Sequence, residues 1–541
     1  MSRADLKRIF NYNAFRPGQE KIIQTIQSGQ DVLVLMPTGA GKSLCFQLPA
    51  IVAKGVTIVI SPLISLIYDQ VTALQNLGIC AYYLNSTTPP LQRLDALNDL
   101  ENTGTEDEPT CECKLLYTTP ESLTSNDEMT DRIDQLYENG LLEGFVIDEA
   151  HCVSNWGHDF RNSYLDLKVI KEYYPLIPIW CFTATATPKA QLDIVKQLNL
   201  KDYRIFINSY IRKNLSYQIE EKPSHPPSHI SRLIKKKYIG QSGIVYCLSR
   251  KNCESMAKFL LGKGISCGFY HAGLSDHKKK AIQDKWLEGK IKVIVATIAF
   301  ALGINKSDVR FVIHESMPKS IESYYQQTGR AGRDGKNSDC IMFYNYRDKV
   351  VLESFSDKNT SKGAPTKANT RVRLTYAMCQ NRYDCLKQQL SNYLGEYIEY
   401  KCEPGENQCR NCFSPTSGNL KDFSQLSKKI ITHVSKNKDI SVPILLSYFD
   451  KQTKYCVGDL NRLFMLLLCK GYLQVKPLVG DKNITDGVQV GDLKLTDQKI
   501  LMKFHLQLNT VDCIITPKKP GHLNFTRDRE QIIDMLNNFK D

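Results

Sequence analysis

The sequence lacks an apolar run long enough to cross a membrane. Its most apolar stretch, Val56 to Tyr68, is interrupted by Ser61, Pro62 and Ser65, and it falls well short of the ~20 residues that a membrane-spanning helix needs. The chain also lacks the bias of disordered or collagen-like proteins, because 42% of its residues are hydrophobic and 23% are charged. We therefore expect folded domains and no membrane partner.

The N-terminus lacks the features of a secretory signal, since residues 1–8 mix charges without an apolar core or a small-residue cleavage site. We therefore expect an intracellular protein, in a compartment where thiols are kept reduced. Most of the 18 cysteines should then be free thiols. A tight cysteine cluster in such a chain indicates metal ligands rather than disulfides.

Acidic residues are too few to balance the basic ones. The chain has 70 Lys and Arg against 57 Asp and Glu, a net charge of +13, and this excess favours a polyanionic partner. It is concentrated between Arg232 and Lys292, where 14 basic residues accompany four acidic ones. A charge run of this kind is often only a solvated surface, so it does not by itself identify the partner.

With 541 residues, the chain exceeds the size of one hydrophobic core, and roughly three or four domains are expected. Short apolar runs alternate with longer amphipathic segments, which is typical of parallel strands buried on both faces. The pattern occurs twice and predicts two tandem α/β domains, joined near the proline-rich segment Lys222–Ser228. The runs are residues 31–36, 56–60, 144–148 and 178–183, then 243–247, 292–296, 309–313 and 340–343.

The C-terminal third follows another pattern. A polar linker (356–370) precedes a cysteine-rich segment, and three helical periodicities (423–434, 442–449, 457–468) precede two strand-like segments. Three helices and a hairpin predict a winged helix, a variant of the helix-turn-helix. The resulting domains are 1–205 and 206–355 (α/β), 356–418 (a helical cysteine-rich module) and 419–541 (winged helix).

The strongest chemical signal is the heptapeptide PTGAGKS, which directly follows the first apolar run. Gly39 and Gly41 allow backbone N–H groups to wrap phosphate oxygens, Lys42 adds a positive charge, and Ser43 is a ligand for Mg²⁺. Met36 stands where the usual phosphate loop has its first glycine, a shorter form that is common in superfamily-two helicases. A chance glycine turn is the alternative, and the position between a strand and a helix disfavours it.

Two further motifs complete a hydrolysis site. Asp148 and Glu149 end an apolar run at the sheet edge where α/β proteins bind ligands. We expect Asp148 to hold Mg²⁺ together with Ser43, and Glu149 to orient or deprotonate the attacking water. Arg330 and Arg333 of the second domain would stabilise the departing phosphoryl group of ATP bound between the domains, an effect of about 10³ to 10⁵ in rate. A solvated basic loop is the alternative for the arginines.

These motifs resemble those of the RecQ family of DNA helicases, from the first thirty residues to the cysteine-rich segment. The resemblance implies two RecA-like ATPase domains with ATP between them. It also implies that Gln19 reads the adenine edge, that Tyr12 and Arg16 flank it, and that Thr38 joins the phosphate loop. The other matching segments are residues 61–66, 69–70, 118–121, 183–187, 270–273 and 296–297.

The segment after the acidic pair resembles the aromatic-rich loop that links single-stranded DNA to ATP hydrolysis in this family. Trp156 and Phe160 offer stacking faces, worth roughly 1 to 3 kcal/mol per base, and Arg161 offers a phosphate contact. The resemblance therefore implies single-stranded and duplex DNA as partners. Packing of the two rings in a core is the alternative.

Three positions depart from the family pattern. Asn305 stands where an aspartate is usual, Ala301 where a glycine is usual, and Gln327 where a glutamate is usual. The hydrolysis motifs are intact. The departures therefore bear on coupling between the domains rather than on the presence of the activity.

The cysteine-rich module ends in a Cys-x-x-Cys pair, Cys409 and Cys412, with Cys385 and Cys402 upstream. Four such thiols suit tetrahedral zinc. Cys379 competes with Cys385 on spacing, and the resemblance to the family's zinc module favours Cys385. The wide spacing is more similar to eukaryotic Bloom-type members, which implies a nuclear protein, or a cytoplasmic one if the source is prokaryotic.

The activity implied by the family is that of an ATP-dependent 3′ to 5′ DNA helicase in recombination, replication and repair, with ATP, Mg²⁺ and Zn²⁺. Two alternatives stay open: an RNA-dependent ATPase of related fold, and an ATP-switched nucleic-acid-binding or annealing scaffold. The hairpin expected at Tyr472–Val490 has no aromatic residue at its 480–483 tip, so a stacking wedge is not expected there.

Overall fold

The computed structural model divides into two compact units, Met1–Pro415 and Thr416–Asp541. The residues that the structure describes are 3–101, 111–154, 161–300, 306–357, 367–382, 384–415, 419–437 and 440–453, with short stretches at 460, 463–464, 467, 472–479, 484–490, 503–506 and 513–515. Within these residues, no helix combines the length and the apolar character needed to cross a bilayer.

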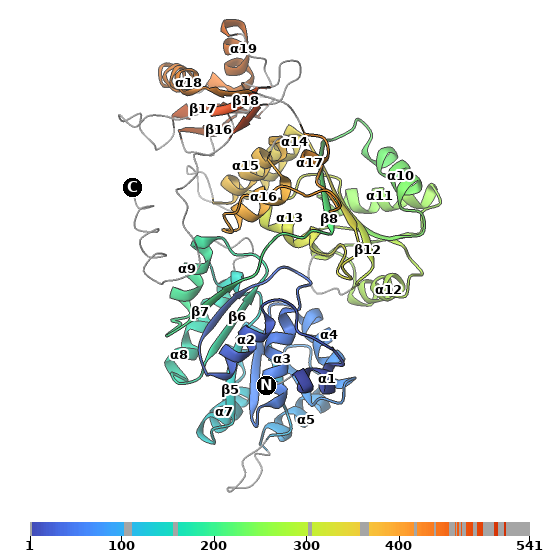
Figure 1. The fold of residues 1–541 in the computed structure, drawn as a ribbon, viewed down its shortest axis with the longest axis vertical. Helices are drawn as coiled ribbons and strands as arrows, with labels where there is room; N and C mark the ends of the chain where they lie inside the picture. The colour runs from blue at the N-terminus through green and yellow to red at the C-terminus, as the bar shows by residue number, and fades with distance from the viewer. Residues whose placement is uncertain are drawn as a thin grey trace. The chain divides into compact units, whose positions relative to one another are not determined.

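The first unit begins with a RecA-like lobe, lobe 1, built on a parallel sheet of seven strands in the order β3-β4-β2-β5-β6-β1-β7 (Figure 1). Its central strands are apolar throughout because helices cover both faces of the sheet. The four expected runs are confirmed as β1, β2, β5 and β6. The strands are β1 Val32–Leu35, β2 Val56–Ile60, β3 Ala81–Leu84, β4 Leu115–Thr118, β5 Leu142–Ile147, β6 Ile179–Thr183 and β7 Arg204–Ile207.

A second parallel sheet, of six strands in the order β10-β11-β9-β12-β13-β8, forms lobe 2. Helices α10 (Pro226–Lys237) and α11 (Arg250–Gly262) pack on one face, around Ile313 of β12. The adjacent residue of that strand, His314, contacts α13 (Ile321–Thr328) on the other face. The strands are β8 Leu215–Glu221, β9 Ser242–Tyr246, β10 Cys267–Tyr270, β11 Val293–Ala296, β12 Val309–His314 and β13 Ser338–Tyr344.

The position of the junction between the lobes differs from our expectation. The segment Lys222–Ser228 lies inside lobe 2, because β8 already pairs with β13 and α10 begins at Pro226. Prolines at the start of a helix stabilise it there, since the first N–H groups have no partner in the helix. Strand β7 extends lobe 1 to Ile207, beyond the expected boundary at residue 205. The chain therefore passes between the sheets at residues 208–214.

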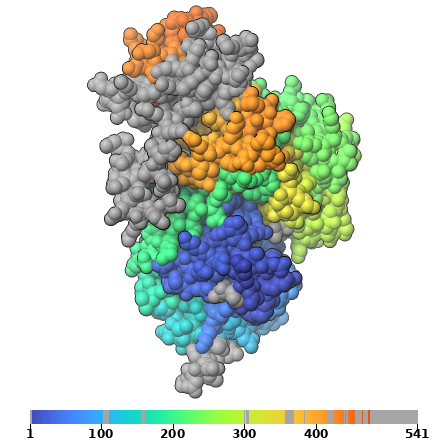
Figure 2. All heavy atoms as spheres, in the orientation of Figure 1, coloured from blue at the N-terminus to red at the C-terminus, as the bar shows by residue number. Residues whose placement is uncertain are grey.

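A helical module follows lobe 2 and packs against it (Figure 2). It contains α15 (Lys367–Gln380), α16 (Leu386–Tyr393) and α17 (Arg410–Phe413), and α14 (Tyr346–Asp357) precedes it. The Tyr393 hydroxyl donates to Glu322 Oε1 at 2.9 Å, and Arg410 pairs with Glu220 at 2.7 Å. The module is thereby tied to both α13 and β8.

The second unit contains α18 (Ser424–Lys436) and α19 (Val442–Gln452), as two of the periodicities predicted. An antiparallel hairpin pairs β16 (Leu473–Val479) with β17 (Ile484–Val490). The third expected helix, 457–468, lies mostly outside the described residues, and the hairpin tip at 480–483 lies wholly outside them. Three short strands, β14 (Asn419–Asp422), β18 (Lys503–Leu506) and β19 (Cys513–Ile515), form a separate small sheet.

Candidate ATP-hydrolysis site and cysteine cluster

The phosphate loop connects β1 to α3 (Lys42–Val52). Gly39 and Gly41 have φ values of 83° and 90°, in the left-handed region that costs glycine nothing and strains other residues. Gly41 is the residue before the helix, so Lys42 and Ser43 stand in its first turn, where free N–H groups and the helix dipole favour anions. The local backbone is therefore that of an anion-binding loop.

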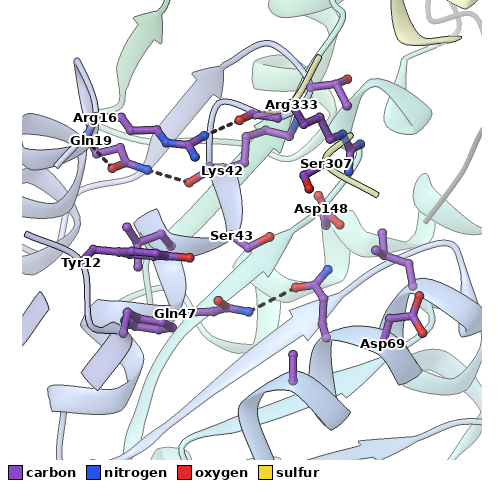
Figure 3. Close-up of a pocket in the computed structure, with 18 of the residues that line it drawn as sticks. Tyr12, Arg16, Gln19, Lys42, Ser43, Gln47, Asp69, Asp148, Ser307 and Arg333 are labelled. Atoms are coloured by element: carbon purple, nitrogen blue, oxygen red, sulfur yellow. Dashed lines mark hydrogen bonds between the residues drawn. The ribbon is translucent and has the colours of Figure 1, made fainter. Parts of the chain in front are cut away.

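A cleft of about 710 Å³ opens at this loop, and residues of both lobes line it (Figure 3). Every residue predicted to contact or hydrolyse the nucleotide lies on its wall. From lobe 1 these are Tyr12, Arg16, Gln19, Thr38, Gly39, Gly41, Lys42, Ser43, Asp148 and Glu149, and from lobe 2 they are Arg330 and Arg333.

Two of the predicted base-contacting residues hold the phosphate loop. Gln19 accepts from the Arg16 backbone N–H at 2.8 Å and donates to the Gly41 carbonyl at 3.0 Å. The Arg16 guanidinium donates to the Gly39 carbonyl. An amide group has two donors and two acceptor lone pairs, so Gln19 keeps one of each for an adenine edge. Tyr12 is 55% exposed and stacks on Phe10.

The acidic pair follows β5, and the pKa values of its two carboxyl groups are shifted in opposite directions. Burial and the adjacent Glu149 raise the pKa of Asp148 to about 7. Burial also acts to raise the pKa of Glu149, but His151 and Lys42 lower it to about 2. His151 Nδ1 lies 3.2 Å from Glu149 Oε2 and 3.0 Å from Thr183 Oγ1. Glu149 is thus held ionised, so its carboxylate can accept a hydrogen bond from the attacking water, and its low pKa makes it a weak base.

A divalent cation fits beside Asp148. The carboxylate is buried, Ser61 Oγ donates to it at 3.4 Å, and Ser43 lines the same cleft. Burial of Asp148 and the nearby negative charge of Glu149 both disfavour its ionised form, and a bound cation would offset both effects. The hard oxygen donors at this position are those that Mg²⁺ prefers.

The arginine-bearing loop, residues 329–337, brings lobe 2 against the phosphate loop. A Cβ built on Gly39 would lie 3.1 Å from Arg333 Cγ, so a larger residue here would press on the arginine side chain. Burial and the neighbouring Arg330 lower the pKa of Arg333 to about 9. Both guanidinium groups are therefore placed where an added anion would relieve their repulsion.

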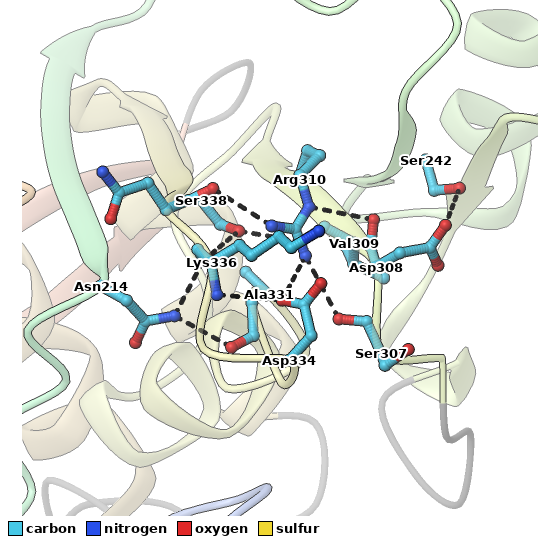
Figure 4. Close-up of polar contacts among 12 residues, drawn as sticks. Asn214, Ser242, Ser307, Asp308, Val309, Arg310, Ala331, Asp334, Lys336 and Ser338 are labelled. Carbon is cyan, nitrogen blue, oxygen red and sulfur yellow. Dashed lines mark hydrogen bonds and ion pairs between the residues drawn. The ribbon is translucent and has the colours of Figure 1, made fainter.

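Polar contacts within lobe 2 hold the arginine-bearing loop in place (Figure 4). Arg310 pairs with Asp334 at 2.6 Å, and Asn214 donates to the carbonyls of Gly332 and Lys336 at 2.9 and 3.0 Å. Ser338 Oγ donates to the Val309 carbonyl at 3.0 Å. The loop is thus anchored to the starts of β8, β12 and β13.

Sequence reasoning missed Arg212, which lies in the segment between the sheets. Its guanidinium donates to the Thr38 carbonyl at 3.1 Å and to the carbonyls of Ala331 and Gly332 at 3.2 and 2.9 Å. One side chain therefore joins the phosphate loop of lobe 1 to the arginine-bearing loop of lobe 2. Its acceptors in the two facing loops are all backbone carbonyls, which no residue pattern in the sequence could have indicated, and its Nε donates to Asn214 Oδ1 at 3.3 Å.

The four predicted cysteines converge in the helical module. The Sγ atoms of Cys385, Cys402, Cys409 and Cys412 all lie within 4.8 Å of one another, and Cys385 Sγ is 3.7 Å from Cys402 and 3.8 Å from Cys409. A zinc tetrahedron with bonds of about 2.3 Å has S···S edges of about 3.8 Å. Cys379 is outside the cluster. The geometry therefore fits a metal held by Cys385 and its three partners.

Backbone N–H groups also point at these sulfurs. Leu386 N–H donates to Cys409 Sγ, and Cys409 N–H donates to Cys402 Sγ, both at 3.4 Å. Such bonds stabilise negative charge on sulfur, and thiolate is the form in which cysteine binds a metal.

Comparison with known proteins places this site in a family. The "DEAD/DEAH box helicase" model matches residues 16–194 and the "Helicase conserved C-terminal domain" model matches residues 226–335. The putative ATP-dependent DNA helicase Q1 of Caenorhabditis briggsae is 39% identical over 87% of this chain and 76% of its own length. The chain belongs to the RecQ family of DNA helicases. The RecQ-like DNA helicase blm-1 of Caenorhabditis elegans is 44% identical over 75% of this RecQ-family chain.

Some relatives are much longer. The matched regions span 41% of blm-1 and 30% of the ATP-dependent helicase SGS1 of Saccharomyces cerevisiae. Among solved structures, the DUF1998 helicase MrfA bound to DNA superposes with a TM-score of 0.53 at 19% identity, covering 69% of this chain and 53% of that one. The helicase Lhr of Mycobacterium smegmatis superposes with a TM-score of 0.52 at 18% identity, over 91% of this chain and 60% of that one. These similarities establish the tandem RecA-like fold.

The structure describes part of the RecQ aromatic-rich loop. Trp156 and Phe160 lie outside the described residues, and so do Ala301 and Asn305. Arg161 donates to the Pro62 carbonyl at 2.9 Å, which ties the end of this loop to the segment after β2. Its expected phosphate contact stays a prediction.

Gln327, the third departure from the RecQ pattern, is buried against β12. Its Oε1 accepts from His314 Nε2 at 2.7 Å. Burial lowers the pKa of His314 to about 4. The neutral glutamine and the neutral imidazole therefore form an uncharged pair three residues before Arg330.

Proposed function

We propose that the chain is an ATP-dependent DNA helicase that moves 3′ to 5′ along single-stranded DNA and unwinds duplex or structured DNA in recombination, replication and repair. The observation that carries this proposal is the shared cleft. The phosphate loop and acidic pair of lobe 1 and the arginines of lobe 2 line the same cavity, so closure of the lobes can control hydrolysis. The polarity and the processes are those of the family.

Hydrolysis would use the groups already in place. The N–H groups of the phosphate loop and the Lys42 ammonium would hold the β- and γ-phosphates. Glu149, ionised and paired with His151, would orient or deprotonate the attacking water. Arg330 and Arg333 would stabilise the charge that develops on the transferred phosphoryl group. Ser43 and Asp148 would hold Mg²⁺, which neutralises phosphate charge and polarises the phosphoryl oxygens when bound.

Movement along DNA would follow from opening and closing of this cleft. ATP bound to lobe 1 attracts the arginines of lobe 2, and loss of the γ-phosphate removes the attraction. Arg212 would stabilise the closed arrangement, because it contacts the facing loops of both lobes. Trp156 and Phe160 would stack on bases and Arg161 would contact a phosphate, so that bound single strands promote closure.

The remaining modules would hold the duplex. We infer that residues 356–418 form a zinc module in which Cys385, Cys402, Cys409 and Cys412 bind Zn²⁺, so that metal binding supplies folding energy. We infer that residues 419–541 form a winged helix that contacts duplex DNA. Because its named relatives include eukaryotic helicases, we also propose a nuclear location.

The test is unwinding of a 3′-tailed duplex by the purified chain. We expect strand separation with ATP, none with a non-hydrolysable analogue, and none with Lys42→Ala, which should still bind DNA. ATP hydrolysis stimulated by RNA and not by DNA would instead assign an RNA-dependent ATPase. Annealing without ATP-driven separation would assign a scaffold.

A further inference from the structure

The basic segment between Arg232 and Lys292 has no role in the proposed mechanism. Part of it lines a second concavity, of about 460 Å³, between α10 and α11 in lobe 2. We call this concavity the α10–α11 groove. Four cationic side chains and two hydroxyl groups line it, and no carboxylate does. The lining residues are Ser228, Ser231, Arg232, Lys235, Lys236 and Lys263.

The sequence of α10 explains why these side chains gather. Ile230, Ile234 and Tyr238 recur every four residues and are buried against the sheet with α11. The cations between them must therefore face outward. Arg232, Lys235, Lys236 and Lys263 are all exposed.

Within the described part of the chain, no carboxylate neutralises the positive charge of the groove. Of the neighbouring lysines, Lys237 pairs with Asp339 at 2.8 Å. Between the residues that the structure describes, no ion pair involves any of the four cations of the groove. Lys263 is placed by its ammonium group over the Phe259 ring, 5.6 Å from the centroid.

The groove is separate from the ATP site. Helices α10 and α11 cover the face of the lobe 2 sheet that includes Ile313. Helix α13, which precedes the arginine-bearing loop, covers the opposite face, where His314 contacts it. The helical module that contains the four cysteines packs on α13. Figure 1 shows α10 and α11 on the side of lobe 2 away from α13 and α16. A polyanion in the groove would therefore leave the nucleotide cleft free.

We propose that the α10–α11 groove binds the phosphate backbone of duplex DNA, as a second DNA surface. This rests on the proposed action on DNA. From Ser228 to Lys236 the helix rises about 12 Å, which spans roughly three or four phosphates of one strand at about 3.4 Å each along the duplex axis. The groove has four cations for them. No aromatic residue lines it, and single-stranded DNA is usually held by base stacking, so the groove suits a duplex, whose bases are enclosed.

The test compares two double variants of the full chain with equal loss of charge. Lys235→Gln/Lys236→Gln removes two cations of the groove. Lys278→Gln/Lys285→Gln removes two exposed lysines of α12 (Asp276–Leu287), which the strand order and right-handed crossovers place on the opposite face of the sheet. The affinity for a blunt duplex is measured between 50 and 200 mM salt, and ATP hydrolysis is measured with a short single strand.

We expect the slope of log affinity against log salt concentration to weaken by about 1.8 in the groove variant, since each phosphate contact contributes about 0.9. The α12 variant should keep the wild-type slope, and both should keep the single-strand-stimulated ATPase. Equal slopes in the two variants would overturn the proposal. The proposal would also be overturned if the groove variant bound duplex DNA like the wild type but no longer bound polyglutamate. That result would indicate an acidic protein as the partner of the groove. Absence of ATP-driven unwinding in the wild type would refute the helicase function. The salt-dependence slopes would still show, independently, whether the groove binds duplex DNA.

Discussion

Replacement of Arg212 by alanine tests whether contact between the two facing loops limits catalysis. The guanidinium makes one hydrogen bond to lobe 1, at the Thr38 carbonyl, and two to the arginine-bearing loop of lobe 2. A hydrogen bond from a charged group contributes about 1.5 to 3 kcal/mol. Loss of the single bond that joins the lobes should therefore lower the population of the closed form, and with it kcat, by about 10- to 150-fold.

The assay is steady-state ATP hydrolysis at saturating single-stranded DNA, together with nucleotide affinity from a fluorescent ATP analogue. We expect kcat to fall while the affinity for nucleotide changes less than threefold, because the groups that contact ATP are retained. Arg212→Lys should restore little, since one ammonium group cannot reach acceptors in both loops with the geometry of a guanidinium.

Arg310→Ala is the matched control for the arginine-bearing loop. It removes the 2.6 Å ion pair with Asp334 inside lobe 2 and leaves the contact between the lobes, so we expect less than a tenfold loss of kcat. If Arg212→Ala stays within threefold of the wild type, or if both variants lose activity equally, then Arg212 does not position the two loops.

Three further predictions concern other parts of the chain. Cys409→Ser should abolish stoichiometric zinc binding and lower the unfolding temperature, whereas Cys379→Ser should retain the metal; retention by both would refute the ligand assignment. His314 has a pKa of about 4 when folded and about 6.5 when unfolded, so unfolding free energy should drop by about 3 kcal/mol as pH falls from 6.5 to 4. A denaturation series with His314→Gln should show a smaller drop, and an identical one would contradict this. Trp156→Ala should keep basal ATPase and lose stimulation by single strands; unchanged stimulation would place Trp156 in the core.

The sequence predicted every interior strand of the two parallel sheets except β4 and none of their edge strands, and for the edge strands the reason is physical. Strands such as β1 and β2 are covered on both faces, so their residues form continuous apolar runs that stand out. Strand β7 is an edge strand with no buried residue, two of its four residues being exposed and two half-buried, and β3 is only half-buried. Neither strand has a distinctive pattern. The expected end of lobe 1, at residue 205, therefore lies two residues before the end of β7. The expected junction, Lys222–Ser228, lies after β8, which already belongs to lobe 2.

The site was predictable where its chemistry requires particular side chains. Glycine at positive φ, a lysine at a helix start and paired acids at a strand end each have few substitutes, and all of them line the cleft. Arg212 was missed because it recognises backbone carbonyls. His151 was missed as the group that keeps Glu149 ionised, because only the fold brings it within 3.2 Å of that carboxylate.

The most direct test of the two-lobe mechanism is the rate of DNA-stimulated ATP hydrolysis by Arg333→Ala. Arg333 belongs to lobe 2 and packs on Gly39 of the phosphate loop, so its loss should leave ATP bound to lobe 1 and remove charge stabilisation from the transition state. We predict a fall in kcat of about 10³ or more, with nucleotide affinity within tenfold of the wild type. A kcat within tenfold of the wild type would contradict the claim that hydrolysis requires both lobes.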